Sequence, residues 1–427
     1  DWSSDVCSSD LPEQAPHPRY RFYPGIETNF GASNRFGWRG REIEPAKPAG
    51  VIRIAMLGDS TTNRYPEIVE HWLNLWASDA HLGVRFETIN AARPGADAAD
   101  AAAIYEQELA PFEPDYVIVY GFGNPLSNAD ALIPMPPRML RSAPSTGRIP
   151  VGRVERWRQR AGATLEPLAS WSAAADFLRH RIVGERGDSL VAEPTKPATT
   201  IAFPPDIDED APNPNAIAKH RGGGLMGLDL YLQGLDRIDR LARQRGARMF
   251  ASTFRVLAFE GLLIPRDVMF KTLNEAWWPY TYSEIHRLAA FFNRALRAWA
   301  AATGNGLVPI DEQMPWRSDL YGDGIHERPA GEALHAWIVL QQLIPAIRDD
   351  LRQHRLPKPA TAVSVDSVYW KIERMPIGAA IDTANAMNAA IPPPPADEIA
   401  GAFSLSKLTV AARDAQVAAG PAPVITT

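Results

Sequence analysis

Short apolar runs alternate along the chain, from Val51 onward, with longer segments in which apolar residues recur every three or four positions. This alternation predicts strand–helix–strand units and a parallel sheet, because strands covered by helices on both faces are continuously apolar. Strands are expected at 52–57, 84–89, 116–120, 248–253 and 307–310. Helices are expected near 66–78, 98–109, 228–245, 283–302 and 329–351.

The order of these elements predicts a five-stranded parallel sheet of the flavodoxin-like type, with strand order 2-1-3-4-5. Crossovers between parallel strands are almost always right-handed, and the chemical motifs described below follow the first three strands. Both conditions require the first strand to be central. The expected fold class is therefore α/β, in a three-layer α/β/α arrangement with helices on both faces of the sheet.

The alternation of strands and helices extends over 51–355, which we interpret as one domain. Less regular sequence precedes it, interrupts it and follows it. Residues 12–50 are rich in Pro, Gly, Arg and aromatic residues and are expected to form an irregular N-terminal extension. The rhythm breaks at about 126–224, which we interpret as an insertion at the rim of the sheet, with a predicted helical hairpin at 154–182. Residues 356–427 form a Pro/Ala-rich C-terminal tail to which we assign no function.

Composition and charge narrow the class of protein. The 427 residues include 45% hydrophobic and 22% charged residues, which is ordinary for a globular protein. The net charge of −6 and the absence of a basic block argue against nucleic acid as a partner. No apolar run reaches the ~18 residues that span a bilayer. The single cysteine, Cys7, excludes an internal disulfide and a cysteine-based zinc site.

The first eleven residues, 1–11, look like translated sequencing-adapter read-through at the broken end of a metagenomic gene. We therefore expect this segment to be an artefact and the true N-terminus to be missing. Such a segment is excluded from reasoning about the fold.

Two short motifs carry the candidate chemistry. Gly58-Asp59-Ser60 directly follows the first strand, and Asp323 precedes His326 by three residues just before the last helix. A serine hydroxyl becomes a nucleophile at neutral pH when a base removes its proton, and a third group fixes the tautomer of that base. Ser60, His326 and Asp323 are candidates for these three roles, which indicates covalent acyl transfer.

Together with two further positions, these motifs resemble the SGNH/GDSL hydrolase family, which is defined by four short blocks in a fixed order. The first and last blocks are the Gly-Asp-Ser and Asp-x-x-His motifs. The second block is matched by Gly95, after the second strand, and the third by Asn124, after the third strand.

The resemblance covers roughly 28–350 without the insertion. The run 34–40, ahead of the first strand, is similar to the lead-in of many bacterial members. The chain departs from the family pattern at Pro125, where an acidic residue is usual, and at Thr61 and Thr62, which replace the commoner residues after the serine. These departures concern the shape of the pocket more than the triad.

What the resemblance implies is a serine hydrolase mechanism without a cofactor. His326 would act as the base for Ser60 and would be oriented by Asp323. The backbone N–H groups of Ser60 and Gly95 and the side-chain amide of Asn124 would form the oxyanion hole.

No metal site is predicted. The acidic run 206–210 fails as a calcium loop because Ala211 stands where such a loop requires glycine. Four histidines within helical segments lack ligand partners at a useful spacing: His71, His180, His286 and His335. Asp59 is expected to be structural, through bonds to the local backbone.

An aromatic run at 277–282 follows the fourth strand, on the side of the sheet that carries the motifs. Four of its side chains are candidates for stacking against a sugar ring: Trp277, Trp278, Tyr280 and Tyr282. At least one is expected to line the cleft that contains Ser60. The alternative, that these side chains cap the core or fix the loop, stays open at this stage.

The expected function is hydrolysis of acetyl or other short-chain acyl esters of carbohydrate or small molecules, through an acyl-Ser60 intermediate. One alternative is an SGNH-type O-acyltransferase acting on polysaccharide, and another is a non-catalytic binding protein of the cell envelope. Relatives with the same lead-in often carry an N-terminal signal or membrane anchor, so an envelope or periplasmic location is expected from the resemblance alone. The sequence leaves the oligomeric state open.

Overall fold

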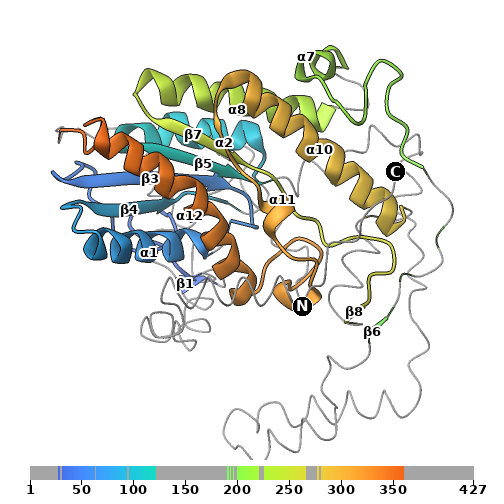
Figure 1. Cartoon of the computed structure of the whole chain (residues 1–427), viewed down its shortest axis with the longest axis horizontal. Coiled ribbons are helices and arrows are strands. Elements are labelled where there is room, and N and C mark those ends of the chain that lie inside the picture. The colour runs from blue at the N-terminus through green and yellow to red at the C-terminus, as the bar shows by residue number, and fades with distance from the viewer. Residues whose placement is uncertain are drawn as a thin grey trace, which may run out of the picture.

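The computed structural model describes residues 27–28, 31–62, 64–93, 96–121, 190–191, 193, 196, 200–220, 226–265, 277 and 280–359. Five strands form the central sheet: β3 (Val51–Gly58), β4 (Arg85–Asn90), β5 (Tyr116–Tyr120), β7 (Arg248–Ser252) and β9 (Gly306–Val308). Their order is β4-β3-β5-β7-β9 and every pair is parallel (Figure 1). This is the predicted order 2-1-3-4-5, and the prediction of fold class is confirmed.

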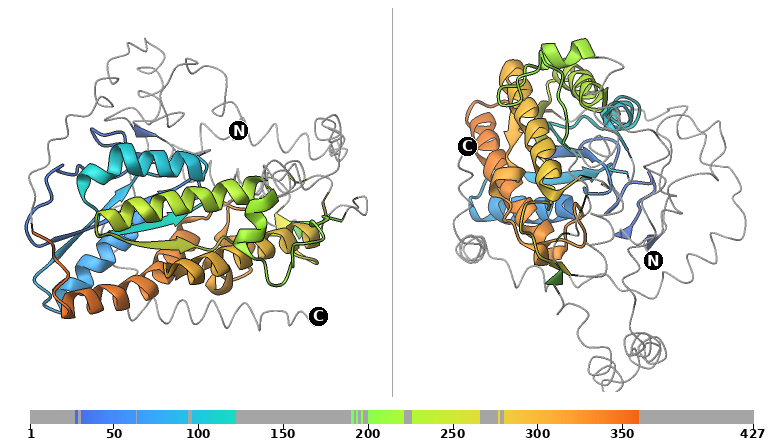
Figure 2. Two further views of the ribbon diagram at one scale, coloured as in Figure 1. Left: turned by 90° about the horizontal axis from the view of Figure 1, so that it is seen from above. Right: turned by 90° about the vertical axis from the view of Figure 1, so that its right-hand side faces the viewer.

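Helices cover both faces of the sheet, as the further views show (Figure 2). On one face lie α1 (Tyr65–Asp79) and α12 (Pro329–Arg352), which pack against each other. On the other face α2 (Ala98–Ile104) packs against α8 (Met226–Gln244). The chain leaves β3 first toward β4 and later returns past β3 to β5, so right-handed crossovers place the corresponding helices on opposite faces. A further long helix, α10 (Tyr282–Thr303), contacts α8 and β9.

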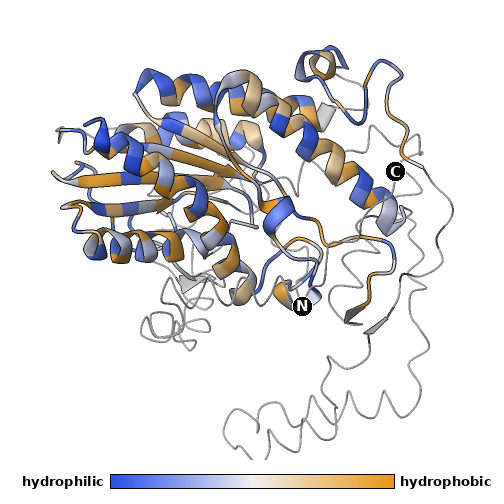
Figure 3. Cartoon of the chain, viewed as in Figure 1, coloured by the Kyte–Doolittle hydropathy of each residue, from blue (hydrophilic) through white to orange (hydrophobic). Residues whose placement is uncertain are grey.

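The core lies between these layers. All residues of β3 and β5 are buried, and apolar residues dominate the sheet while the outer helices are striped (Figure 3). In α1 the buried stripe is formed by Val69, Trp72, Leu73 and Trp76, at three- and four-residue spacing. This burial, rather than helix propensity, supplies most of the stability of such helices.

Two predicted elements differ from the observed ones. The expected helix 98–109 is α-helical only to Ile104 and continues as a π-helical turn, Tyr105–Leu109. In this turn the Glu108 carboxylate is fully buried and forms an ion pair with Arg93. The periodicity of the segment does not predict this ion pair. The last strand ends at Val308 because Pro309 has no N–H for the ladder, and the next residue begins the short helix α11 (Ile310–Gln313).

The smaller elements lie outside the central sheet. Two antiparallel pairs are formed by β1 (Glu27–Thr28) with β2 (Gly31–Ala32), and by β6 (Leu190–Val191) with β8 (Ile264–Pro265). The helical turns are η3 (Ala110–Phe112), α7 (Pro214–Ile217), η6 (Ala218–His220) and η7 (Ser318–Leu320). The predicted hairpin 154–182, residues 1–11 and the tail from 360 onward lie outside the described residues. Within the part of the chain that the structure describes, no helix is both long and apolar enough to cross a membrane.

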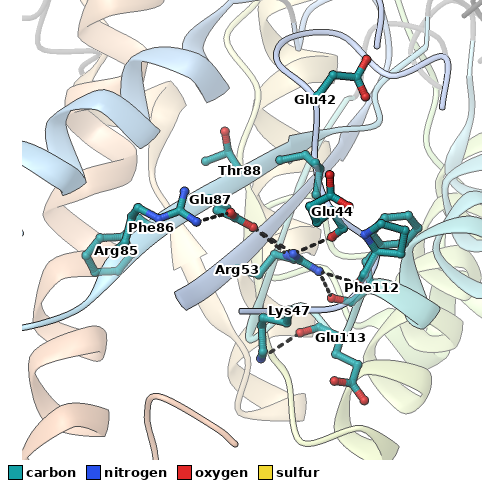
Figure 4. A network of polar contacts seen from close by, with 12 residues as sticks. Glu42, Glu44, Lys47, Arg53, Arg85, Phe86, Glu87, Thr88, Phe112 and Glu113 are labelled. Carbon is teal, nitrogen blue, oxygen red and sulfur yellow. Dashed lines mark hydrogen bonds and ion pairs between the residues drawn. The ribbon is translucent and has the colours of Figure 1, made fainter. Parts of the chain in front are cut away.

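The N-terminal extension is irregular in its described part and contributes to the core through Phe36, Trp38 and Ile43. It is fastened by a buried polar network at the amino end of the sheet (Figure 4). Arg53 lies within β3 and donates to Glu87 Oε2 at 2.9 Å and to the backbone carbonyls of Glu44, at 2.8 Å, and Phe112, at 2.8 Å.

Asp115, just before β5, is the anion of a second part of this network. Its Oδ2 accepts from the backbone N–H of Arg53 at 2.9 Å, and Lys47 Nζ lies 2.9 Å from its Oδ1. Both side chains of this ion pair are buried, at 1% exposure for Lys47 and 0% for Asp115. Asp115 therefore joins the extension to the centre of the sheet.

Replacing Asp115 with alanine should lower the free energy of unfolding by about 3–5 kcal/mol, because it leaves a buried lysine without its countercharge. Urea denaturation followed by tryptophan fluorescence measures this loss. The matched control is Glu42→Ala, which removes the exposed ion pair with Arg35 and should cost less than about 1 kcal/mol. Equal unfolding midpoints for the two variants would show that the buried pair does not hold the extension.

Candidate active site

Ser60 lies in a sharp turn at the carboxyl end of the central strand β3. The turn brings the chain very close to β5: a Cβ at Gly58 would lie 1.9 Å from the Tyr120 carbonyl oxygen and 2.2 Å from Thr62 Oγ1. Only glycine is compatible with this approach. Sites in open α/β sheets gather at the carboxyl ends of the strands, where this turn lies.

Asp59 shapes the turn, as expected of a structural residue. Its Oδ1 accepts from the backbone N–H of Thr61 at 2.8 Å and from Thr61 Oγ1 at 2.6 Å, and its side chain is buried. Thr62 Oγ1 then donates to the Tyr120 carbonyl at 3.1 Å. Thr61 is thus bonded within the serine turn, and Thr62 holds the turn against β5.

Asp323 and His326 belong to a tight loop between η7 and α12. Asp323 Oδ1 accepts from the backbone N–H groups of Ile325, at 2.8 Å, and His326, at 2.7 Å. Asp323 Oδ2 lies 2.6 Å from His326 Nδ1. The loop is closed by a hydrogen bond of 2.7 Å from Gly322 N to the His326 carbonyl. The three-residue spacing lets one carboxylate hold both the loop backbone and the imidazole.

The structure brings the serine and the histidine together. Ser60 Oγ lies 2.7 Å from His326 Nε2, although 266 residues separate them in the sequence. Because His326 Nδ1 faces the Asp323 carboxylate, Nδ1 carries the proton of the neutral ring, and Nε2 can accept from the serine hydroxyl. The three candidate residues therefore form one hydrogen-bonded chain with the polarity that a nucleophile, a base and an orienting acid require.

Electrostatics favour a charged imidazole in this chain. Burial alone would lower the pKa of His326, but the hydrogen bond and charge of Asp323, with smaller contributions from Asp59 and Glu327, raise it above its usual value. Burial would raise the pKa of Asp323, yet the hydrogen bonds from His326 and the loop backbone lower it. The site thus stabilises a carboxylate beside an imidazolium.

The loop is also anchored to the strand beyond β5. The backbone N–H of Leu257, after β7, donates to the Gly324 carbonyl at 2.8 Å. Nearby, the Arg255 guanidinium stacks over the Trp316 ring at 3.6 Å and donates to the carbonyls of Met314, at 2.7 Å, and Asp311. Burial lowers the pKa of Arg255 to about 10. The sequence did not predict these contacts of Arg255, because a single arginine after a strand is not part of any recognisable motif.

The run 34–40, noted as a lead-in, contacts the serine turn directly. The backbone N–H of Arg39 donates to the Asn90 carbonyl at 3.3 Å, and Arg39 Nη1 donates to the Thr62 carbonyl at 3.0 Å. Trp38 Nε1 donates to the buried Glu108 at 3.2 Å. The lead-in therefore links the ends of β3 and β4 with the π-helical turn that follows α2.

The two other candidate oxyanion residues, Gly95 and Asn124, lie outside the described residues. The chain that leads to each of them does approach the serine turn. Arg93 N donates to the Gly58 carbonyl at 3.1 Å. A Cβ at Gly121 would lie 3.1 Å from the backbone nitrogen of Asp59. Their roles stay predictions.

Three of the four candidate aromatic side chains, those of Trp277, Tyr280 and Tyr282, are buried in the core, and Trp278 lies outside the described residues. Lys196, in the segment 126–224 that we interpret as an insertion, donates to the Tyr280 carbonyl at 2.7 Å and lies 4.5 Å from the centre of the Tyr282 ring. These contacts join Tyr280 and Tyr282 to Lys196. Contact of any of the four with substrate remains a prediction.

No cluster of three or more histidine, cysteine, aspartate or glutamate side chains suited to a metal ion occurs among the described residues.

Comparison with known proteins identifies no family. No family model matches the chain, and no curated protein matches it. Among solved structures, the chain is similar to a GDSL-like lipase from Bacteroides thetaiotaomicron at 9% identity and a TM-score of 0.33, over 69% of this chain and 88% of that one. It is also similar to an acetylxylan esterase from Geobacillus stearothermophilus at 12% identity and a TM-score of 0.36, over 68% and 94%. Similarities this low say nothing about activity, so the fold assignment rests on the strand order and pairing.

Proposed function

We propose that this chain is a serine esterase of the SGNH/GDSL type, acting through an acyl-Ser60 intermediate. The observation that carries the proposal is the hydrogen-bonded chain from Ser60 Oγ through His326 to Asp323, with distances of 2.7 Å and 2.6 Å. Its place at the carboxyl end of the central strand supports a catalytic rather than a structural role.

In the first step, Ser60 Oγ attacks the ester carbonyl carbon while His326 Nε2 takes the hydroxyl proton. The tetrahedral intermediate collapses when the C–O bond to the alcohol breaks, and His326 gives its proton to the departing alkoxide. Asp323 stabilises the imidazolium that exists between these events. In the second step, water attacks the acyl-enzyme with His326 again as the base, which releases the carboxylic acid and restores Ser60.

The developing oxyanion would be held by the backbone N–H groups of Ser60 and Gly95 and by the Asn124 amide. The N-terminus of α1, which begins five residues after Ser60, adds positive potential on the same side. Loss of one such donor typically costs about 10²–10³ in rate.

For the substrate, we propose acetyl or other short-chain acyl esters of carbohydrate or small molecules. The side chains of His326 and Asp323 are 24% and 13% exposed, so the imidazole keeps some contact with solvent. The carbohydrate part of the proposal depends on the aromatic run 277–282.

The test is to compare hydrolysis of p-nitrophenyl acetate, p-nitrophenyl octanoate and a peracetylated sugar by the wild type and Ser60→Ala. We expect Ser60-dependent release of acetate, faster from the acetyl than from the octanoyl ester. Repeating the assay with an unacetylated oligosaccharide separates transfer from hydrolysis, since a transferase forms product only with the acceptor. Absence of any acyl release, with or without acceptor, would contradict the proposed function.

The pH dependence follows from the raised pKa of His326. Only the neutral imidazole accepts the serine proton, so kcat/KM should rise as the pH increases through the pKa of His326 in the free enzyme. Half-maximal kcat/KM is therefore expected above the usual histidine value of about 6.5. Measuring kcat/KM for p-nitrophenyl acetate between about pH 5 and pH 9 tests this, and an acid limb centred below pH 6.5 would contradict it.

A further inference from the structure

A second histidine–carboxylate pair lies directly behind the catalytic loop. Glu327, the residue after His326, extends its carboxylate into the interior, where both oxygens lie 3.1 Å from His335 Nδ1. The side chains are buried, at 0% exposure for His335 and 1% for Glu327. Within the described part of the chain, His335 Nε2 has no partner, so this imidazole is hydrogen-bonded only to Glu327.

The His335 ring also contacts the two elements that flank the serine turn. It stacks on Tyr65, the first residue of α1, with ring centroids 3.9 Å apart and an interplanar angle of 9°. It meets Tyr120, the last residue of β5, edge-on at 4.4 Å and 87°. One imidazole therefore touches the helix that follows Ser60 and the strand that precedes Asn124, while bonding to the residue next to His326.

The start of α12 is built to allow this close contact. A Cβ at Gly331 would lie 2.4 Å from the Leu320 carbonyl oxygen and 3.1 Å from Glu327 Cβ. Glycine at this position lets the catalytic loop lie directly on the first turn of the helix. The loop, the helix and Glu327 thus form one packed unit.

We propose that the buried Glu327–His335 pair positions the catalytic histidine, by fixing the Asp323–His326 loop against α1 and β5. The inference rests on the proposed function. Replacing a buried polar pair with apolar residues is often neutral for stability, so such a pair is weak evidence for a purely structural role. A positioning role explains why Glu327 is adjacent to His326 and why His335 contacts both α1 and β5, the two elements beside the serine turn.

The charge of Glu327 has a second consequence, on the pKa of His326. Among the described residues, Asp323, Asp59 and Glu327 each raise the pKa of His326. The described groups around the pair also include the phenols of Tyr65, Tyr120 and Tyr321, which burial keeps neutral, and the Arg255 guanidinium, which faces Tyr120 and Tyr321. Glu327→Gln should therefore lower the pKa of His326.

The first experiment measures this pKa without relying on activity. NMR titration of ¹⁵N-labelled histidine in the full chain, assigned with His326→Gln, should show that the His326 pKa is lower in Glu327→Gln than in the wild type. The acid limb of kcat/KM should shift by the same amount. An unchanged His326 pKa in Glu327→Gln would overturn the electrostatic part of the proposal.

The second experiment separates positioning from packing. His335→Phe keeps a ring over Tyr65 but cannot donate to Glu327, whereas His335→Asn can place an amide N–H near the position of Nδ1. We expect His335→Phe to lower kcat about 10- to 100-fold with little change in KM, since small misplacement of a catalytic group costs this much, and His335→Asn to recover much of the loss.

The matched control is Tyr116→Phe, at the opposite end of β5, which removes the buried hydrogen bond from Tyr116 to Asp350. The two variants are compared at an equal loss of melting temperature. If kcat then falls no further in His335→Phe than in Tyr116→Phe, the Glu327–His335 pair has only a structural role. A wild type without Ser60-dependent esterase activity would instead refute the proposed function, and the NMR titration would still decide whether Glu327 sets the His326 pKa.

Discussion

Ser60→Ala is expected to lower kcat/KM for p-nitrophenyl acetate by about 10⁵- to 10⁶-fold, to the level left by binding and the oxyanion hole. Ser60 Oγ lies within hydrogen-bonding distance of His326 Nε2, so this variant removes the proposed nucleophile itself. The melting temperature should stay within a few degrees of the wild type, since a partly exposed hydroxyl contributes little to the free energy of unfolding.

The matched control for this variant is Ser252→Ala in β7. Ser252 is fully buried, and its hydroxyl has no hydrogen-bond partner among the described residues. The same chemical change there should leave kcat/KM within about twofold of the wild type. Retention of more than about 1% of activity in Ser60→Ala, or an equal loss in Ser252→Ala, would exclude Ser60 as the nucleophile.

Asp323→Asn is expected to lower kcat by about 10³- to 10⁴-fold, the effect of forcing the base into the wrong tautomer. The amide oxygen can still accept from the loop N–H groups of Ile325 and His326, so the backbone of the loop should survive. The amide N–H₂ would then face His326 Nδ1, which favours the ring tautomer protonated at Nε2. That tautomer cannot accept the Ser60 proton.

The chain supplies a matched control for this variant as well. Asp206 contacts His220 at 2.9 Å on the exposed surface, and Asp206→Asn alters the same type of pair away from the site. Kinetics at pH 8 should show wild-type activity for Asp206→Asn. Activity within tenfold of the wild type for Asp323→Asn would mean that Asp323 does not orient the base.

The arrangement of the sheet could be predicted because it depends on local patterns and handedness. Apolar runs located all five strands, and right-handed crossovers required β3 to be central. The end of the last strand was misplaced although the local signal, Pro309, is in the sequence, whereas the error in the helix 98–109 comes from a distant contact. The periodicity of 98–109 is that of a regular helix, and nothing in it shows that Glu108 turns inward to pair with Arg93 from another segment.

The candidate site could be predicted in part, for a similar reason. Ser60 and His326 belong to motifs that follow or precede regular elements, so the fold alone brings them to one edge of the sheet. The Glu327–His335 pair has no such signal, because His335 looks like one more residue on the buried face of α12. Its partner comes from the loop before the helix, and only the three-dimensional structure shows that they meet. The oxyanion roles of Gly95 and Asn124 stay predictions.

The most direct test of the central claim is covalent labelling of the full chain with a fluorophosphonate, followed by intact-mass and peptide mass spectrometry. An activated serine attacks phosphorus, the P–F bond breaks, and the serine stays phosphonylated. The account predicts a single adduct on Ser60, its absence in Ser60→Ala and much slower labelling of Asp323→Asn. A wild type that is not labelled, or a label on another residue that persists in Ser60→Ala, would contradict it.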